Sequence, residues 1–389
     1  MRMGMIAESL SRIAELHVAI VPVAGRLSVP DDLLCRLNAR VHQFDLEGAA
    51  DTSLSLMSLV ADPERRLEIF RRYNKPSLTG LVGLALRNRL GALVSDLCPD
   101  IVVIGRGYLA HLVDIVPEAA RLIIDLDEDD VSSSASQARC IRPKDPVRAQ
   151  WLMQEADATR RLIDRAMSRT GLALAAAPRD AAALRQRHSG SPVVCVPNAV
   201  HLPRARHRQG RGKTQMAPSI LFVGALGYEP NIRGLLWFCR VVLPRLRSVF
   251  PTLRLIIAGA RPDPRVRRLA CHAGIRVIAD PVSVAPLYAG AQLVVAPLLD
   301  GGGTRIKLIE AAAHGKPAVA TPASLAGLGN LPGVRRAPAQ ADVFARACLL
   351  ALKQGNDQSV ARLPRSFNAA HAIPALAQIF SRLNQSVSA

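Results

Sequence analysis

The chain has 389 residues, too many for one ordinary core, and this length favours two domains of roughly 200 residues each. Apolar residues make up 49% of the sequence, but no uninterrupted apolar run reaches the ~18–20 residues that a membrane-spanning helix needs. The formal net charge is +19, yet the eight Phe, four Tyr and two Trp form no aromatic series among the Arg residues. These features argue against a membrane-spanning protein and against a nucleic-acid partner.

Two explanations of the basic charge remain open. A basic surface suits an anionic membrane leaflet or a diphosphate-linked lipid acceptor, and solvated Arg residues of an Arg-rich proteome would give the same charge. No signal peptide with an apolar core opens the chain, so we expect a cytoplasmic protein that is soluble or peripheral at the inner membrane face. The seven Cys are scattered without a Cys-x-x-Cys pair, which indicates reduced thiols and no structural metal site.

The first half alternates predicted helices with apolar strands. A helix opens the chain, and two longer helices are predicted at 79–98 and 147–170 from their helical periodicity. The predicted strands are "HVAIVPV", "PDIVVIG", "RLIIDLD", "LALAAA" and "PVVCVPNAV". Strands separated by helices at this spacing predict a parallel, doubly wound sheet, whose ligands bind at the carboxyl ends of the strands.

Two loops at such strand ends carry candidate functional residues. His111 ends the first, at 105–111, and is an acceptor-side proton acceptor, a contact for a hydroxyl or a structural residue. The second, at 125–134, contains Asp125 and Asp127, which line the cleft or supply oxygen ligands to a divalent cation, as in metal-dependent GT-A glycosyltransferases. A third interpretation is that Asp130 or Ser132 caps the following helix.

Residues 203–218 are polar, basic and without periodicity, which is typical of a linker that lets two domains close on a substrate. Beyond it, a predicted strand ends at Gly224 and a helix follows, in which Asn231 either caps the helix or touches a ligand. Further strands end at Gly259 and at Ala279, so the alternation of strand and helix continues through the second half.

The stretch from Leu298 to Thr321, "LLDGGGTRIKLIEAAAHGKPAVAT", is predicted to be a glycine loop, a helix and a strand. Three consecutive Gly residues indicate a close approach of the backbone to a ligand. Arg305 and Lys307 add positive charge to a helix N-terminus, where cations are disfavoured unless a phosphate binds there. Thr304, Lys307 and Glu310 share one helix face, and the Glu310 carboxylate suits the hydroxyls of a ribose or of a sugar attached to a diphosphate. Ile306, Ile309 and Ala313 form a separate stripe that we expect to be buried.

This stretch resembles the donor-binding segment of glycosyltransferase family 4, and "PNIRGLLWF" resembles another element of that family. The family consists of retaining enzymes with the two-domain GT-B architecture. Many members carry a Glu-x7-Glu pattern whose second Glu matches Glu310, but the position of the first is occupied here by Gly302. Backbone N–H groups of the loop would then have to replace that carboxylate, and Ala225 stands where many members have a diphosphate-binding Arg.

The resemblance implies two Rossmann-like, doubly wound domains that face a cleft. It places an acceptor-side domain at 1–202 without the usual first strand, the linker at 203–218, a donor-binding domain at 219–363 and a helix at 364–389 that packs back on the first domain. The implied nucleotide-sugar contacts are Gly224, Asn231, Gly259, Ile278, Ala279, Gly302, Gly303, Thr304 and Thr321. Glu310 would orient the donor, Lys307 and Arg305 would stabilise the departing diphosphate, and His111 would lie on the acceptor side.

The predicted function is therefore transfer of a sugar, with retention and without a metal or other cofactor, from a nucleotide diphosphate to a glycan or lipid-linked acceptor. The pathway expected is surface polysaccharide biosynthesis. A nucleotide-sugar epimerase of similar architecture is one alternative. The other is a degenerate GT-B subunit that binds a nucleotide or a partner, because the first strand and one Glu of the family pattern are missing.

Overall fold

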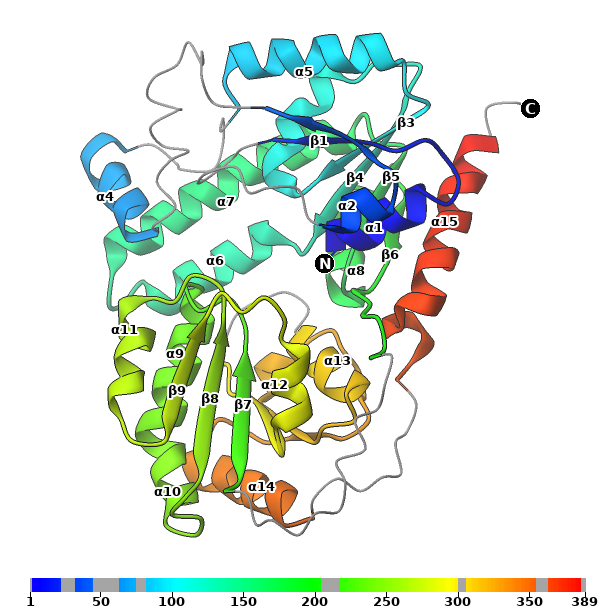
Figure 1. Ribbon diagram of the computed structural model, residues 1–389. Coiled ribbons are helices and arrows are strands. Elements are labelled where there is room, and N and C mark those ends of the chain that lie inside the picture. The colour runs from blue at the N-terminus through cyan, green and yellow to red at the C-terminus, as the bar shows by residue number, and fades with distance from the viewer. Residues whose placement is uncertain are drawn as a thin grey trace. The chain divides into compact units, whose positions relative to one another are not determined.

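A computed structural model describes residues 2–21, 32–44, 63–74, 82–203, 217–299, 306–354 and 363–385 (Figure 1). The chain divides into two compact units. The first comprises Met1–Pro197 together with His371–Ala389, and the second comprises Asn198–Ala370. The glycine loop at 300–305 and most of the predicted linker, at 204–216, lie outside the described residues.

The first unit contains two parallel sheets. Four central strands pair in the order β3-β4-β5-β6, and β1 pairs with β2 in a separate sheet. Their bounds are β1 His17–Ile20, β2 Arg40–Gln43, β3 Ile101–Gly105, β4 Arg121–Asp127, β5 Leu172–Ala175 and β6 Val193–Cys195. The apolar runs predicted these strands, because a parallel strand covered on both faces is apolar at nearly every position. Accordingly, β4 is buried from Leu122 to Leu126.

Helices connect and cover these strands. Their bounds are α1 Arg2–Leu10, α2 Asp32–Arg36, α4 Pro63–Tyr73, α5 Leu84–Leu97, the 3₁₀ helix η1 Gly107–Ile115, α6 Asp130–Ile141, α7 Pro146–Met167, α8 Pro178–Arg187 and α15 Ala369–Gln385. The Arg-rich helix α7 buries one face against the core, and its Trp151 packs with Leu67 and Phe70 of α4. From His371 onward, α15 belongs to the first unit although it ends the chain.

The second unit is built on one parallel sheet of six strands in the order β12-β11-β10-β7-β8-β9. The bounds are β7 Ser219–Val223, β8 Arg254–Gly259, β9 Ile275–Ala279, β10 Leu293–Ala296, β11 Ala318–Ala320 and β12 Val334–Arg336. The chain runs outward from β7 through β8 to β9 and then returns to β10 on the other side of β7. The direction of winding therefore reverses between β7 and β10, and in sheets of this kind ligands bind at such a point, outside the carboxyl ends of the strands.

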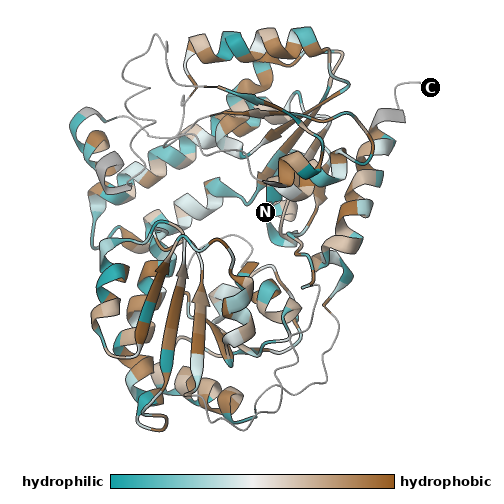
Figure 2. Ribbon diagram, in the orientation of Figure 1, coloured by the Kyte–Doolittle hydropathy of each residue, from teal (hydrophilic) through white to brown (hydrophobic). Residues whose placement is uncertain are grey.

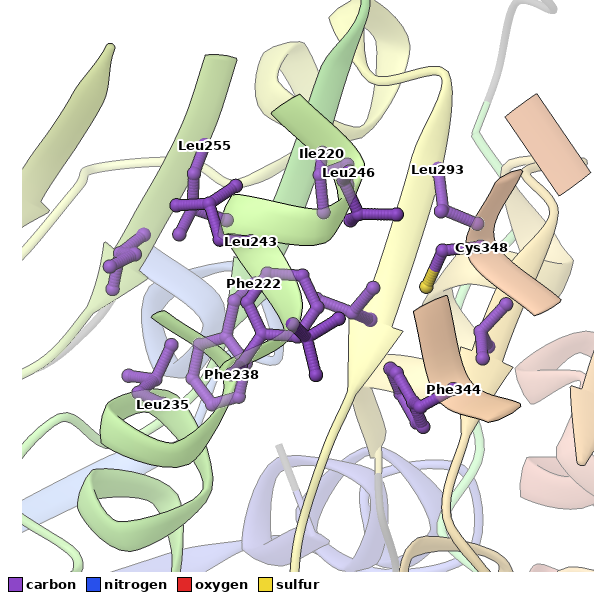
Figure 3. Close-up of a cluster of buried hydrophobic side chains, with 14 of the residues drawn as sticks. Ile220, Phe222, Leu235, Phe238, Leu243, Leu246, Leu255, Leu293, Phe344 and Cys348 are labelled. Atoms are coloured by element: carbon purple, nitrogen blue, oxygen red, sulfur yellow. The ribbon is translucent and has the colours of Figure 1, made fainter. Parts of the chain in front are cut away.

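Alternate residues of β7 face two separate helical layers. Ile220 and Phe222 pack with α9, α10 and α14 in the cluster drawn in Figure 3, whereas Leu221 and Val223 pack with α12 and α13. The elements here are α9 Glu229–Trp237, the π-helix η2 Phe238–Val242, α10 Leu243–Arg247, α11 Pro264–Arg267, η3 Arg268–Cys271, α12 Ala285–Gly290, α13 Ile306–Ala313, η4 Pro322–Leu325, α14 Ala341–Gln354 and η5 Arg365–Phe367. Figure 2 shows the apolar strands of this sheet between more polar helices.

The α/β class with parallel sheets and covering helices confirms the predicted fold class. Of the stripe expected to be buried on α13, Ile309 is buried, whereas Ile306 and Ala313 are only partly buried. The buried face of the helix also includes Leu308 and Ala311, which join Ile309 in the core cluster that contains Tyr288 of α12. Among the helices in the described part of the chain, none has both the length and the apolar character needed to cross a membrane.

Candidate functional site

The carboxyl ends of β7 and β10 carry the centre of the candidate site. Gly224 follows β7 directly, and Leu298 follows β10 and leads into the glycine loop. Four predicted ligand contacts in that loop lie outside the described residues: Gly302, Gly303, Thr304 and Arg305. Their roles stay predictions, and the described part of the site begins at α13.

Lys307 is held at the end of β7. Its side chain is 7% exposed, and its Nζ donates a hydrogen bond of 3.0 Å to the Oδ1 of Asn231. The same Nζ lies 3.8 Å from the centroid of the Phe222 ring, a cation–π contact. A Cβ atom at Gly224 would lie 3.0 Å from both the Lys307 Nζ and the Asn231 Nδ2. The ammonium group is therefore fixed against the backbone of Gly224, where the space that a side chain would need is taken by Lys307 and Asn231.

Asn231 orients this lysine and does not cap α9. Its Nδ2 donates a hydrogen bond of 2.8 Å to the carbonyl oxygen of Ala225, which leaves Oδ1 to accept from Lys307. The N-cap position of α9 is Tyr228, which makes no side-chain capping bond. The expected capping role is thus wrong, because Asn231 lies inside the first turn of the helix and its amide bridges the loop after β7 to α13.

Glu310 lies one helical turn after Lys307 and faces α12. The hydroxyl of Tyr288 donates a hydrogen bond of 2.7 Å to its Oε2. Burial raises the pKa of the Glu310 carboxyl, while the hydrogen bond from Tyr288 and the charge of Lys307 lower it. The two residues that the sequence places on one helix face are therefore anchored to different elements, Lys307 to α9 and Glu310 to α12.

The neighbouring strand ends are packed too closely for any side chain but hydrogen. A Cβ atom at Gly259 would lie 1.7 Å from the carbonyl oxygen of Gly224, and the φ of Gly259 is +154°. The sequence predicted Gly259 as a nucleotide contact, but contact between β7 and β8 already requires glycine here. Ile278 and Ala279 end the adjacent strand, where Ala279 pairs in register with Gly259 and its side chain is exposed.

Thr321 directly follows β11, and its hydroxyl points into the protein. It is 1% exposed, donates to the carbonyl oxygen of Leu298 and lies 2.9 Å from the hydroxyl of Ser324. The Ser324 hydroxyl in turn donates to the carbonyl oxygen of Ala296. This pair of hydroxyls fixes the chain where it leaves β10, and a direct contact of Thr321 with a ligand stays a prediction.

The Asp-rich turn of the first unit is occupied by arginines. Both carboxylate oxygens of Asp125, which is 0% exposed, accept hydrogen bonds from the Arg2 Nε, at 2.8 and 2.9 Å. Arg106 forms an ion pair with Asp127, and both residues have positive φ. A divalent cation at Asp125 would have to displace a buried guanidinium, so these residues do not fit the Asp-x-Asp metal site that was the alternative. In the described part of the chain, no cluster of three or more His, Cys, Asp or Glu is arranged to hold a metal ion.

The residue that caps α6 in the same turn differs from the predicted one. Asp129 caps α6: its carboxylate accepts from the backbone N–H of Ser132 at 3.2 Å and from the Ser132 hydroxyl at 2.6 Å. The cap is therefore neither Asp130 nor Ser132, although Ser132 supplies the donors. Burial, together with the nearby Glu128, raises the pKa of Asp130 to about 7.

His111 lies in the 3₁₀ helix after β3, in the first unit. Its ring is partly buried, and burial followed by the charge of Arg87 lowers its pKa. A neutral imidazole suits a proton acceptor and also a packed structural residue, so both interpretations remain open for His111.

The sequence reasoning missed two residues of the site, Phe222 and Tyr288. Phe222 lies under the Lys307 ammonium, and Tyr288 holds Glu310. Both belong to apolar runs that were interpreted as core, and only their contacts with α13 set them apart. Tyr288 and Glu310 are 22 positions apart in the chain, and Asn231 and Lys307 are 76 apart, so no local sequence pattern predicts these contacts.

Comparison with known proteins finds a family match within the second half of the chain. Residues 217–354 match the family described as "Glycosyl transferases group 1", and this range includes Gly224, Asn231, Lys307 and Glu310. A segment of 123 residues is 27% identical to an "Uncharacterized 44.6 kDa protein in cps region" of Klebsiella pneumoniae. This match covers 30% of the chain and 32% of that relative, so the chain spans about a third of the length of the relative.

Solved structures resemble the whole chain. A sucrose-phosphate synthase from Thermosynechococcus elongatus matches with a TM-score of 0.64 at 14% identity, over 98% of this chain and 91% of that one. Anabaena HepE, solved in complex with UDP and glucose, matches with a TM-score of 0.59 at 12% identity, over 99% and 94%. A glycosyltransferase from Rickettsia africae matches with a TM-score of 0.58 at 10% identity, over 98% and 94%. The chain therefore has the GT-B fold of these solved structures, and its residues 217–354 match the group 1 glycosyl transferases.

Proposed function

We propose that the protein is a retaining, metal-independent glycosyltransferase, which moves a sugar from a nucleotide diphosphate to a glycan or lipid-linked acceptor. The observation that carries the proposal is the placement of the Lys307 ammonium. It is buried beside Gly224, where the winding of the sheet reverses, and Glu310 lies one turn further along the same helix. The match to group 1 favours this activity over the two alternatives, a nucleotide-sugar epimerase and a degenerate GT-B subunit.

The chemistry assigned to these residues follows from their charges. As the bond from the sugar to the diphosphate breaks, negative charge grows on the leaving group, and a fixed ammonium stabilises that charge without having to reorganise. Lys307 is held in place by Asn231 and Phe222, so it meets this requirement. Glu310 would accept hydrogen bonds from hydroxyls of the donor. Arg305 and the loop residues Gly302, Gly303 and Thr304 are proposed to complete the phosphate contacts.

Metal independence is proposed because the positive side chains of Lys307 and Arg305 would balance the negative charge of the diphosphate. The Asp-x-Asp pair offers no competing cation site, since Arg2 and Arg106 hold its carboxylates. Retention is proposed from the resemblance to glycosyltransferase family 4. The UDP and glucose bound to Anabaena HepE support a nucleotide-sugar donor.

The acceptor and the cellular location are proposed from the Klebsiella pneumoniae relative and from the net charge. The "cps region" named for the Klebsiella pneumoniae relative supports a role in surface polysaccharide biosynthesis. The net charge of +19 supports contact with an anionic membrane surface or a diphosphate-linked lipid. We place the protein in the cytoplasm, peripheral to the inner membrane face, and propose no nucleic-acid partner.

A thermal-shift experiment tests the donor site. UDP, GDP and ADP are added separately, each with EDTA or with manganese, and one of the three is expected to raise the melting temperature equally under both conditions. Stabilisation follows from ligand binding to the folded state and also identifies the base. Protection that requires manganese would contradict metal independence.

A second assay tests catalysis. The purified protein is incubated with a panel of nucleotide sugars and membrane extract, and release of a nucleotide diphosphate is measured. Release above the rate of a Lys307→Met control supports transfer. Normal nucleotide binding without release across the panel would favour the degenerate subunit.

A further inference from the structure

Tyr288 is a buried residue of α12 whose only polar atom contacts α13 twice. The side chain is 0% exposed. Its hydroxyl lies 2.7 Å from the Oε2 of Glu310 and 3.3 Å from the carbonyl oxygen of Lys307. A hydroxyl has one proton to donate, and the shorter contact, to a carboxylate, is the stronger of the two. The imidazole of His314 stacks on the Tyr288 ring, with centroids 5.0 Å apart and an angle of 12° between the planes.

The hydroxyl of Tyr288 is not needed to fill the core. A phenylalanine has the same ring and would make the same apolar contacts with Leu308 and Ile309, without a polar group to desolvate. What the hydroxyl adds is a fixed donor beside Glu310. Each carboxylate oxygen can accept more than one hydrogen bond, so Glu310 can accept from further donors while Tyr288, a fully buried residue, holds its Oε2.

We infer that Tyr288 is a positioning residue, which holds the Glu310 carboxylate ionised and oriented to accept hydrogen bonds from hydroxyls of the nucleotide-sugar donor. The inference rests on the proposed function, since it deepens the role given there to Glu310. In this arrangement a hydroxyl of α12 holds a carboxylate of α13, and the carboxylate contacts the donor.

The charges around the pair are consistent with these protonation states. Burial and the neighbouring Glu310 raise the pKa of Tyr288 well above its ordinary value, so the phenol keeps its proton and donates. Burial raises the pKa of Glu310, and the Tyr288 bond and Lys307 oppose that shift. Burial, and then the charge of Lys316, lower the pKa of His314, so a neutral imidazole stacks on the phenol.

The test is a double-mutant cycle between Tyr288→Phe and Glu310→Gln, with Ser219→Ala as a matched control. Ser219 is also buried, and its alanine variant also loses a hydroxyl. That hydroxyl lies at the start of β7 and bonds to the carbonyl oxygen of Gly290 and to the side chain of Gln292. Calorimetry measures the Kd of whichever of UDP, GDP or ADP protects the protein, and initial rates give kcat and KM for its nucleotide sugar. Removing a hydrogen bond to a charged group is expected to lower kcat/KM about 10- to 100-fold in Tyr288→Phe. In the Glu310→Gln background the same change should cost less than about 2-fold.

The pH profile separates positioning from a general structural role. Without the Tyr288 donor the Glu310 anion is less stabilised, its pKa rises, and the acid limb of kcat/KM should move to higher pH. Ser219→Ala should leave the limb unchanged. The position of the limb does not depend on how much of a variant is folded, so it decides even if Tyr288→Phe melts early.

Two failures have different meanings. If the wild type binds nucleotide or turns over, and Tyr288→Phe keeps its Kd, kcat/KM and acid limb, the inference falls and the proposed function stands. Equal losses from Tyr288→Phe in both backgrounds would also overturn it, because the effect would not pass through Glu310. A wild type that neither binds any of the three nucleotides nor turns over refutes the proposed function and the inference with it.

Discussion

Replacing Lys307 with methionine tests the centre of the proposed site, because it removes a charge and keeps an unbranched apolar chain of similar length. The Lys307 side chain is 7% exposed, and its Nζ donates a hydrogen bond of 3.0 Å to the Oδ1 of Asn231. The same Nζ lies 3.8 Å from the centroid of the Phe222 ring. Methionine fills the same space over Phe222 without the ammonium. The alanine variant differs, because it also empties the space that the lysine stem occupies.

The expected magnitudes separate catalysis from stability. Loss of one preorganised contact to developing charge lowers kcat by about 10²–10³-fold, or about 2.7–4 kcal/mol, and both variants should show it. Alanine also removes three buried methylenes at about 0.8 kcal/mol each, roughly 2 kcal/mol in all. For units of this size, that loss lowers the melting temperature by roughly 4–8 °C. Lys307→Met should melt within a few degrees of the wild type.

The assay is release of nucleotide diphosphate from the preferred nucleotide sugar, with the melting temperature of each variant measured beside it. The reasoning predicts that Lys307→Met is folded and slow, and that Lys307→Ala is slow and less stable. Wild-type turnover by folded Lys307→Met would falsify the assignment of leaving-group stabilisation to this ammonium. If both variants melt equally early, the lysine serves the packing of α13 against β7.

Three further changes test the surroundings of the site. Glu310→Gln keeps the size of the side chain but loses the anion, so donor affinity and turnover should both fall in binding and rate measurements. Gly259→Ala should destabilise the second unit severely, because the new Cβ atom would lie 1.7 Å from the Gly224 carbonyl oxygen, and an unchanged melting temperature would refute that close approach. Arg2→Met should cost about 3–5 kcal/mol in denaturant unfolding at neutral pH, because it strands the buried Asp125 carboxylate. Burial raises the pKa of Asp125 in the folded protein above its ordinary 3.8, and Arg2 opposes this shift. Without Arg2 the folded state holds the Asp125 proton more tightly than the unfolded state does, so the variant's stability should fall as the pH rises above 3.8. A loss of stability that is independent of pH would contradict the stranded charge.

Local sequence patterns predicted the strands of the second unit closely. The strands predicted to end at Gly259 and Ala279 are β8 and β9, and Gly224, the predicted end of the first strand, directly follows β7. Apolar runs are informative because a strand buried on both faces must be apolar at consecutive positions. The patterns extend over a few residues, and so do the structures that they determine.

Contacts between distant segments were beyond these patterns. Arg2 neutralises Asp125 across 123 positions of the chain, and that pairing is what removes the Asp-x-Asp motif from consideration as a metal site. The cap of α6 is Asp129, one residue before the predicted Asp130. The sequence could not distinguish them, because several neighbouring polar side chains are chemically able to accept from a free N–H group at a helix start. Which of them does so depends on where β4 ends, and the sheet determines that.

The burial of Lys307 shows why the motif and its setting have to be considered together. From sequence, Lys307 and Glu310 share one face of a helix and point at a ligand, opposite a stripe expected to be buried. In the structure α13 is buried along most of its length, with Lys307 turned to Asn231 and Glu310 to Tyr288. A cation and a carboxylate one turn apart would otherwise attract each other and lose their separate directions. Because α9 and α12 each hold one of them, the helix can present a positive group to a leaving diphosphate and a negative group to sugar hydroxyls without either having to reorganise.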